Sequence, residues 1–442
     1  MKPLFTPHGA AFAIDRLESR GFEAYAVGGC VRDSLLGKVP HDWDLTTNAR
    51  PEEIIACFPD CRVIETGVRH GTVTVLHRGE PLEITTYRRD GIYADHRHPV
   101  QVTFSKTLAD DLSRRDFTVN AMAYHPKRGL VDLFGGQKDL SRGVIACVGD
   151  APTRFEEDGL RILRALRFAS VLGFSLDPGT ARAVHDRRSL LDFIAAERIR
   201  EEWDKLLLGK NAVPILRDYA DVVVQIFPEV AASVGFPQRT KYHCYDVYEH
   251  TLQAIGESKP DLRVRLALFF HDLGKPAVHT EEDGVDHFKG HAAESARLCD
   301  AAMARLRYDN ATREEVCFLV ERHDFPIPCT DRAVRRLLMK VPPETVLRLL
   351  EIKRCDRLAH APDFREQSPE QTEIPRLMEE IRARDDCISL RSLAVRGDDL
   401  IALGYRPGKA LGAALQALLD AVVDGDLPNE REALLREAEK RK

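Results

Sequence analysis

A glycine pair followed closely by two aspartates constrains the first part of this chain more than any other feature. Gly28 and Gly29 end the apolar run 24–27 and open a segment of helical character. Backbone amides at such a helix start can bind phosphate oxygens. Asp42 and Asp44 follow, and on an extended strand two residues spaced i, i+2 project from the same face. Adjacent carboxylates beside a phosphate-binding turn suit two magnesium ions and in-line phosphoryl or nucleotidyl transfer, although each motif alone is common in turns and surface loops.

Length and composition set the outer limits. A chain of 442 residues predicts about three domains, and its 44% apolar fraction is typical of soluble globular proteins. No apolar run approaches the ~20 residues of a membrane span, and the first residues lack a secretory signal pattern. Ten cysteines without a CxxC pair indicate reduced thiols in a cytoplasmic protein. The net charge of −6 argues against broad electrostatic binding of nucleic acid but leaves room for a local basic groove.

Residues 1 to about 150 alternate helical and strand patterns, which predicts an α+β head with a small mixed sheet and helices. Helices are expected at 10–20 and 29–36, and strands at 23–27, 43–46, 62–64, 72–76 and 82–87. Glu83 lies in the last of these strands and could bring a third carboxylate beside the aspartate pair. It could equally be a surface glutamate.

Two further motifs carry charged groups suited to a nucleotide. Arg114 and Arg115 precede Asp116, and paired arginines beside an aspartate can bind a triphosphate while staying oriented. Asp158 and Arg161 lie three residues apart in a segment that becomes helical near residue 154. They are therefore expected to share a helix face, where they could read the edge of a nucleobase. In isolation, both motifs would be interpreted as surface ion pairs.

The ordered motifs GGCVRD, DWD, RRDFTVNAM, DLFGG and EDGLR resemble those of CCA-adding enzymes and bacterial poly(A) polymerases, members of the polymerase-beta superfamily. The resemblance covers about residues 20–210. It implies that Asp42 and Asp44, with Glu83 nearby, hold two Mg²⁺ ions. It also implies a nucleotide site that chooses CTP or ATP without a template, formed by Gly28, Gly29, Arg32, Arg114, Arg115, Asp116, Asn120, Asp158 and Arg161. The segment 90–99 resembles the family's flexible loop, needed for the switch to ATP, although many relatives have an arginine where this chain has His98.

A second set of chemically active residues begins near residue 240. A histidine, a His-Asp pair after an apolar helix and a distant aspartate resemble the metal site of HD domains, with two extra histidines as in dinuclear relatives. The implied ligands are His250, His271, Asp272, His291, His323 and Asp356. Imidazoles and carboxylates suit transition metals or magnesium, so the identity of this divalent ion stays open. The site could hydrolyse 2′,3′-cyclic or 3′-phosphate at tRNA ends, or it could be a scaffold that grips the tRNA body.

These motifs predict four parts: a head over 1–150, a nucleotide-selecting helical neck over 151–235, an HD domain over 236–362 and a helical tail over 363–442. The basic segment 332–357 is either a tRNA-backbone surface or a solvated helix face. The expected function is cytoplasmic addition of C, C and A to tRNA 3′ ends from CTP and ATP, with no membrane partner. Poly(A) polymerase, a CC-only adding enzyme and an HD phosphohydrolase with a nucleotide-sensing head are the alternatives, and the oligomeric state is left open.

Overall fold

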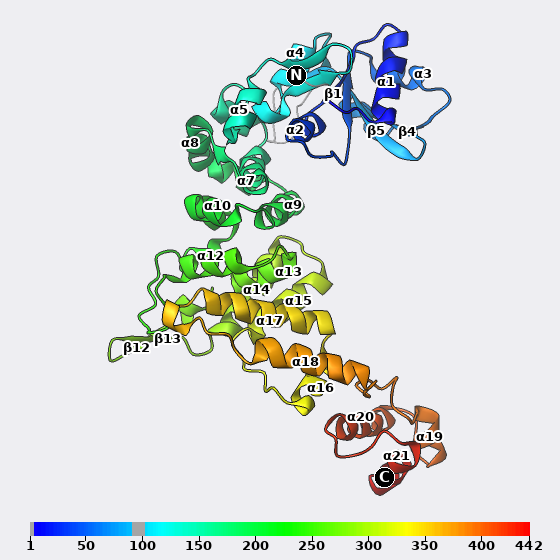
Figure 1. Cartoon of the computed structure of the whole chain (residues 1–442), viewed down its shortest axis with the longest axis vertical. Helices are drawn as coiled ribbons and strands as arrows, with labels where there is room; N and C mark the ends of the chain where they lie inside the picture. Colours follow the sequence, from blue (N-terminus) through cyan, green and yellow to red (C-terminus); the bar gives the residue numbers. More distant parts are fainter. Residues whose placement is uncertain (1–3, 91–101) are drawn as a thin grey trace. The chain divides into compact units, whose positions relative to one another are not determined.

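The computed structural model describes residues 4–90 and 102–442, which form two compact units, 1–228 and 229–442 (Figure 1). The first unit begins with a mixed sheet and helices and continues as helices, and the second is almost wholly helical. The predicted α+β head followed by helical domains is therefore confirmed. The finer division into four parts stays a prediction.

Seven strands of the first unit form one sheet in the order β3-β4-β5-β2-β1-β8-β9. The pair β2–β5 is parallel, whereas the pairs β1–β2, β1–β8, β3–β4, β4–β5 and β8–β9 are antiparallel. Every residue of β1 is buried, as expected of a strand inside a sheet covered on both faces. The strands are β1 Ala24–Val27, β2 Asp44–Thr47, β3 Arg62–Ile64, β4 Thr72–His77, β5 Glu80–Thr86, β8 Met122–His125 and β9 Gly129–Asp132.

Short helices accompany this sheet, and a separate hairpin pairs β6 Arg88–Asp90 with β7 Val102–Phe104. The first helix illustrates the packing: Ala13, Ile14 and Leu17 are almost completely buried, at the spacing that puts them on one helix face. The helices are α1 His8–Ser19, α2 Gly29–Leu35, α3 Pro51–Cys57, α4 Leu108–Ser113 and α5 Gly136–Arg142.

The rest of the first unit consists of α6 Ala151–Glu157, α7 Leu160–Leu172, α8 Pro178–Arg187, α9 Ala196–Leu207, α10 Ala212–Asp218 and α11 Ala220–Ile226, with the small pair β10 Val144–Ile145 and β11 Ser175–Leu176. Trp203 of α9 is completely buried, and its ring centroid lies 4.7 Å from that of Phe227.

The second unit is built around α13, whose residues 264–270 are all buried. A helix buried on every side lies inside a helical domain rather than on its surface. The elements are α12 Val247–Glu257, α13 Leu262–Phe270, α14 His291–Arg305, α15 Asn310–Arg322, α16 Asp331–Lys340, α17 Pro343–Leu358, α18 Glu370–Ala383, α19 Gly397–Ala402, α20 Lys409–Val423, α21 Arg431–Lys440 and the hairpin β12 Thr280–Glu282 and β13 Val285–His287. Across the described ranges, no helix has both the length and the apolar character needed to cross a membrane.

Candidate functional sites

The parallel pair β2–β5 brings two of the predicted head carboxylates together. Asp44 and Glu83 are paired in the strand register. Asp42 lies two residues before β2, outside the strand, and is exposed. The pKa of Asp44 is raised, first by desolvation and then by the negative charges of Glu83 and Asp42, while Arg115 lowers it. Glu83 and Asp42 thus both place negative charge near Asp44.

These carboxylates are close but not assembled into a tight ligand set. Among the described residues, the groups of three or more ligand atoms within 4.8 Å of one another both lie in the second unit. That Asp42 and Asp44 project from one face stays a prediction: β2 begins at Asp44, and both aspartates are exposed whereas Trp43 between them is buried.

The predicted glycine turn lies against an arginine of the RRD motif. Gly28 has φ 83°, in the left-handed region that favours glycine. A Cβ at this position would lie 3.1 Å from Nη1 of Arg115. The helix that follows has only seven residues. Cationic side chains, rather than a long helix dipole, therefore dominate the electrostatics of this turn.

A buried carboxylate that the motifs did not reveal holds both arginines. Asp111 of α4 accepts hydrogen bonds from Nε and Nη2 of Arg114 at 2.9 and 2.7 Å and from Nη2 of Arg115 at 3.2 Å. It also accepts one from Thr46 Oγ1 at 3.1 Å. Burial alone would raise the pKa of Asp111, but Arg115 and Arg114 lower it. Asp111 lies three residues before Arg114 and four before Arg115, and this spacing is the sequence signal that could have revealed the contact.

Asp116 and Asn120 connect a second arginine network. Asp116 Oδ2 accepts from Nε and Nη2 of Arg164 at 2.9 and 2.6 Å, and its Oδ1 accepts from Asn120 Nδ2 at 3.2 Å. Asn120 Oδ1 in turn accepts from Nη1 of Arg32 at 2.6 Å. Burial opposes ionisation, but Arg164 and Asn120 bring the pKa of Asp116 down to about 2. Both oxygens of Asp116 are thus engaged inside the protein, and Arg164 was missed from the sequence.

Asp158 and Arg161 do not share a helix face, and this expectation was wrong. The helix is interrupted at Asp158, whose backbone is extended, and Gly159 separates α6 from α7. A Cβ at Gly159 would lie 2.9 Å from the carbonyl oxygen of Leu190, so close packing here requires glycine. Asp158 Oδ1 accepts from the backbone N–H of Leu160 at 3.1 Å, which caps the new helix.

The side chains of Asp158 and Arg161 are each held by other partners. Asp158 Oδ2 accepts from Nη2 of Arg198 at 3.1 Å. Arg161 Nη2 donates to the carbonyl of Arg114 at 3.0 Å, and its Nη1 forms an ion pair with Glu157. Arg161 is therefore coupled directly to the RRD segment. The predicted flexible loop 90–99 lies, beyond Asp90, outside the described residues.

The basic segment 332–357 includes arginines with internal partners. Arg332 Nη2 lies 2.8 Å from Asp424 Oδ2, and Arg336 Nε lies 2.5 Å from Asp424 Oδ1. The carboxylate of Asp424, directly after α20, thus neutralises part of the charge on α16, which favours the structural interpretation of these two residues.

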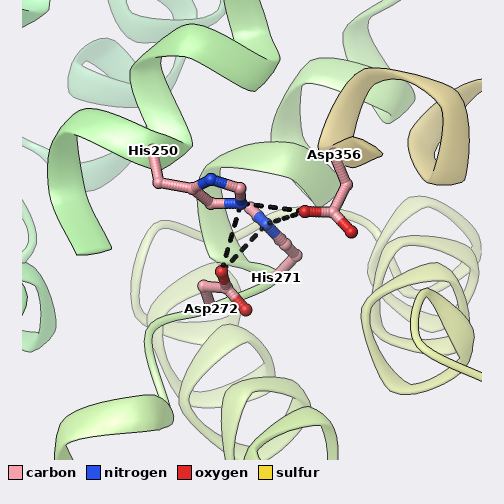
Figure 2. A group of neighbouring side chains, drawn as sticks. All are labelled: His250, His271, Asp272 and Asp356. Atoms are coloured by element: carbon pink, nitrogen blue, oxygen red, sulfur yellow. Dashed lines mark hydrogen bonds and ion pairs between the residues drawn. The ribbon is translucent and has the colours of Figure 1, made fainter. Parts of the chain in front are cut away.

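In the second unit, His250, His271, Asp272 and Asp356 converge from α12, the end of α13 and α17, as Figure 2 shows. Nε2 of His250 lies 2.8 Å from Asp356 Oδ1 and 3.5 Å from Asp272 Oδ2. Nε2 of His271 lies 3.2 Å from Asp272 Oδ2 and 3.5 Å from Asp356 Oδ1. Three of the four residues are almost completely buried.

Asp272 also belongs to a second group of potential metal ligands, together with His291 and His323. Its Oδ1 lies 3.4 Å from Nε2 of His291 and 3.8 Å from Nε2 of His323. The two oxygens of Asp272 therefore face different histidine pairs, Oδ2 toward the first group and Oδ1 toward the second. All six residues expected at this site are brought together.

Main-chain carbonyls orient the four histidines. Each Nδ1 lies within hydrogen-bond distance of a carbonyl oxygen: 3.3 Å for His250, 2.6 Å for His271, 2.9 Å for His291 and 2.7 Å for His323. Because each Nδ1–H donates to such a carbonyl, each Nε2 is left with its lone pair toward the cluster. This is the outer-shell arrangement that prepares imidazoles as metal ligands.

The cluster opens into a cavity of about 360 Å³. Lys275 lies beside it, with Nζ 2.6 Å from Asp272 Oδ2 and 2.7 Å from Gln238 Oε1. Burial alone would raise the pKa values of Asp272 and Asp356, but neighbouring histidines, together with Lys275 at Asp272, hold both well below the usual range. Carboxylate oxygens and imidazole nitrogens that converge in this way suit a divalent cation. Sequence reasoning missed Lys275, whose signal was its i, i+3 spacing from Asp272.

Comparisons with known families agree with this architecture. Residues 24–146 match the Poly A polymerase head domain, 173–233 match a "Probable RNA and SrmB- binding site of polymerase A", and 300–438 match "tRNA nucleotidyltransferase domain 2 putative". The sheet with its acidic strand pair and the first of these matches define a nucleotidyltransferase head.

Named relatives make the class more specific. The chain is 48% identical over 200 residues to the CCA-adding enzyme of Lactiplantibacillus plantarum and 50% identical over 206 residues to that of Lactobacillus delbrueckii subsp. bulgaricus. These matches cover 45% and 47% of this chain, and the chain spans about half the length of the relatives, 49% and 52%.

A solved structure extends the similarity over the whole chain. The Bacillus stearothermophilus CCA-adding enzyme in complex with CTP is 30% identical, with a TM-score of 0.75 over 99% of this chain and 98% of that one. The Thermotoga maritima CCA-adding enzyme complexed with tRNA has the same fold, at 23% identity, a TM-score of 0.58 and coverage of 98% and 94%. The chain belongs to the CCA-adding enzyme family.

Proposed function

We propose that this protein is a template-independent tRNA nucleotidyltransferase that adds CCA to tRNA 3′ ends from CTP and ATP. The observation that carries the proposal is the register of β2 and β5, which pairs Asp44 with Glu83 beside Arg115. The names of the relatives and the CTP complex of the 30% identical structure support the same activity.

The head carboxylates fit divalent magnesium. Asp44 has a raised pKa because desolvation and the charges of Glu83 and Asp42 disfavour its ionised form, and a hard cation with oxygen ligands would relieve this repulsion. We propose that Asp42 and Asp44 hold two Mg²⁺ ions, with Glu83 beside them. When bound, such ions activate the 3′-hydroxyl and stabilise the pyrophosphate leaving group.

The protein's own cations would position the triphosphate. Arg114 and Arg115 are held by Asp111, so both guanidinium groups are oriented before the nucleotide arrives, which lowers the entropic cost of binding. Their charge would offset the charge that develops on the phosphates. Arg32 is oriented by Asn120, whose Oδ1 accepts a hydrogen bond from Arg32 Nη1 at 2.6 Å.

Base selection is proposed to involve Asp158 and Arg161. In this structure their side chains bind Arg198 and Glu157, so hydrogen bonding to CTP or ATP requires exchange of at least one internal contact. Such exchange would let one pocket present two patterns of donors and acceptors without a nucleic-acid template.

The test uses a tRNA transcript that ends at the discriminator base, incubated with magnesium and CTP, ATP or both. Gel mobility reports the number of nucleotides added. Three additions that require both nucleotides support the proposal. Two additions with both present would identify a CC-only enzyme, and a long ladder with ATP alone would identify a poly(A) polymerase. No addition by folded protein would refute nucleotidyl transfer and favour an HD phosphohydrolase with a nucleotide-sensing head.

We propose a second activity for the histidine cluster: hydrolysis of 2′,3′-cyclic or 3′-phosphate at tRNA ends. The converging nitrogen and oxygen donors fit one divalent ion at His250, His271, Asp272 and Asp356, with His291 and His323 able to hold another. When bound, the ion would activate water as the nucleophile. Lys275 would place positive charge beside a phosphate in the adjoining cavity.

Phosphate release from a tRNA with a 2′,3′-cyclic end, measured with added manganese, nickel or magnesium, tests this activity. His271→Ala is expected to abolish release and to leave CCA addition intact. Release that persists in the variant would assign the activity to another site or a contaminant. No release by wild type would leave the cluster as a scaffold for the tRNA body.

The remaining expectations form part of the same proposal. All ten cysteines are free, and tRNA is the proposed substrate, which together support action in the cytoplasm. We also propose the functional division into head 1–150, neck 151–235, HD domain 236–362 and tail 363–442.

A further inference from the structure

Two cysteines of the second unit face each other between neighbouring helices. Cys299 lies in α14 and Cys317 in α15, and these helices pack side by side (Figure 1). Their Sγ atoms are 3.9 Å apart, which is direct contact. Small buried residues on α14 let α15 approach this closely; they are Ala292, Ser295, Cys299 and Ala302. A small movement of the two side chains therefore brings the sulfurs to bonding distance.

The two thiols have different surroundings. Cys299 is completely buried, and burial raises the pKa of its thiol. Cys317 is only partly buried. The pKa of Cys317 is lowered, first by its contact with Cys299 and further by Arg313, against the opposing effects of burial and Asp300. Peroxides react with the thiolate of an accessible cysteine, so Cys317 is the thiol that reacts first and Cys299 is the thiol in contact with it.

We propose that Cys299 and Cys317 form a site of reversible oxidation, at which a hydroperoxide generates a disulfide between α14 and α15. The Cys317 thiolate attacks the peroxide, whose O–O bond breaks to give a sulfenic acid and, after protonation, an alcohol or water. The Cys299 sulfur then attacks the sulfenic sulfur. An S–S bond forms, the S–O bond breaks, and hydroxide leaves as water with the proton of Cys299. Two electrons pass from the thiols to the peroxide in total.

The packing of the two helices fits a reversible bridge rather than a permanent one. Both thiols are free, and Cys299 also packs against Met303, with Sγ 3.6 Å from Sδ, so the helix pair is closely packed without a covalent bond. In the cytoplasm proposed for this protein such a disulfide would be transient, because dithiol reductants reverse it by thiol–disulfide exchange. α14 begins at His291 and His323 directly follows α15, so the bridge would join the two helices that carry these proposed metal ligands.

The test uses the full-length wild-type protein, first reduced and then treated with a stoichiometric amount of hydrogen peroxide. Remaining thiols are blocked with N-ethylmaleimide, and the protein is digested with trypsin in the absence of reductant. Trypsin cleaves at the arginines on either side of each cysteine, so the bridge is expected to link peptides 298–305 and 314–322. Two of the ten thiols should be lost, and dithiothreitol should restore both. This result does not depend on nucleotidyl transfer or phosphate hydrolysis.

Variants separate the roles of the two cysteines. Cys317→Ser should lose the linked peptides, and Cys299→Ala should leave Cys317 as a sulfenic acid that dimedone traps. Cys329→Ser is the matched control, because Cys329 is an exposed cysteine of the same unit and its variant should form the same link as wild type. Absence of the link in oxidised wild type, whatever happens to its other thiols, would overturn the proposal, as would a bridge from Cys317 to any other cysteine. The wild-type digest decides the question even where a variant fails to fold.

Discussion

Replacing Arg164 by methionine tests the buried hydrogen-bond network that joins Arg164 of α7 to Asp116 and Asn120. The variant keeps most of the side-chain volume but removes both hydrogen bonds and the counter-charge of Asp116, which is only 9% exposed. The pKa of Asp116 is lowered from 3.8 to about 2, a shift that corresponds to roughly 2 kcal/mol of folding stability at neutral pH. Arg164→Met is therefore expected to lower the free energy of unfolding by about 2 kcal/mol at pH 7.

The pH dependence of this loss follows from the direction of the shift. Because the folded pKa of Asp116 lies below its unfolded value, its stabilising contribution is complete above about pH 5 and is lost as pH falls from 4 toward 2. The difference between wild type and Arg164→Met should therefore shrink to about half by pH 3.

Urea unfolding followed by tryptophan fluorescence measures this difference for the correct unit, because the two tryptophans, Trp43 and Trp203, both lie within residues 1–228. Arg187→Met is the control. Arg187 pairs with Glu156 on the surface, so its loss should change stability by less than about 1 kcal/mol at any pH. An Arg164→Met effect of equal size at pH 7 and pH 3, or one no larger than the control, would refute the assigned role of the network.

Two further variants test the head and the neck. Asp44→Ala should abolish nucleotide addition. It should not lower the urea midpoint of the tryptophan transition, because the carboxylate that it removes is repelled by Glu83 and Asp42. Normal addition by the folded variant would contradict the proposed metal site. Gly159→Ala should lower the free energy of unfolding by about 1–3 kcal/mol, because the added Cβ would lie 2.9 Å from the carbonyl oxygen of Leu190. Unchanged stability would show that the junction between α6 and α7 can shift to make room for the methyl group.

Part of the candidate sites could be predicted from the sequence. The strand carrying Glu83 could be predicted from its alternating pattern, and the six residues of the histidine cluster from their resemblance to the metal site of HD domains. The break at Asp158 could have been anticipated from Gly159, but the helical periodicity on both sides concealed it. β8 was not predicted, although it pairs with β1 and begins two residues after Asn120.

The residues that hold the site depend on tertiary contacts and were missed for that reason. Arg164 reaches Asp116 across 48 positions, and no local pattern distinguishes it from other helix arginines.

The parallel pairing of β2 with β5 has a consequence for how the protein matures. The chain between Asp44 and Glu83 contains α3, β3 and β4, so these two carboxylates meet only after that whole segment has been synthesised and paired. The arginine side requires still more chain, since β8 joins β1 across about a hundred residues. Long-range pairings of this kind form late in folding. A ribosome-bound fragment that ends before residue 122 would therefore lack β8 and its pairing with β1, so the sheet that carries the proposed nucleotide site would still be incomplete.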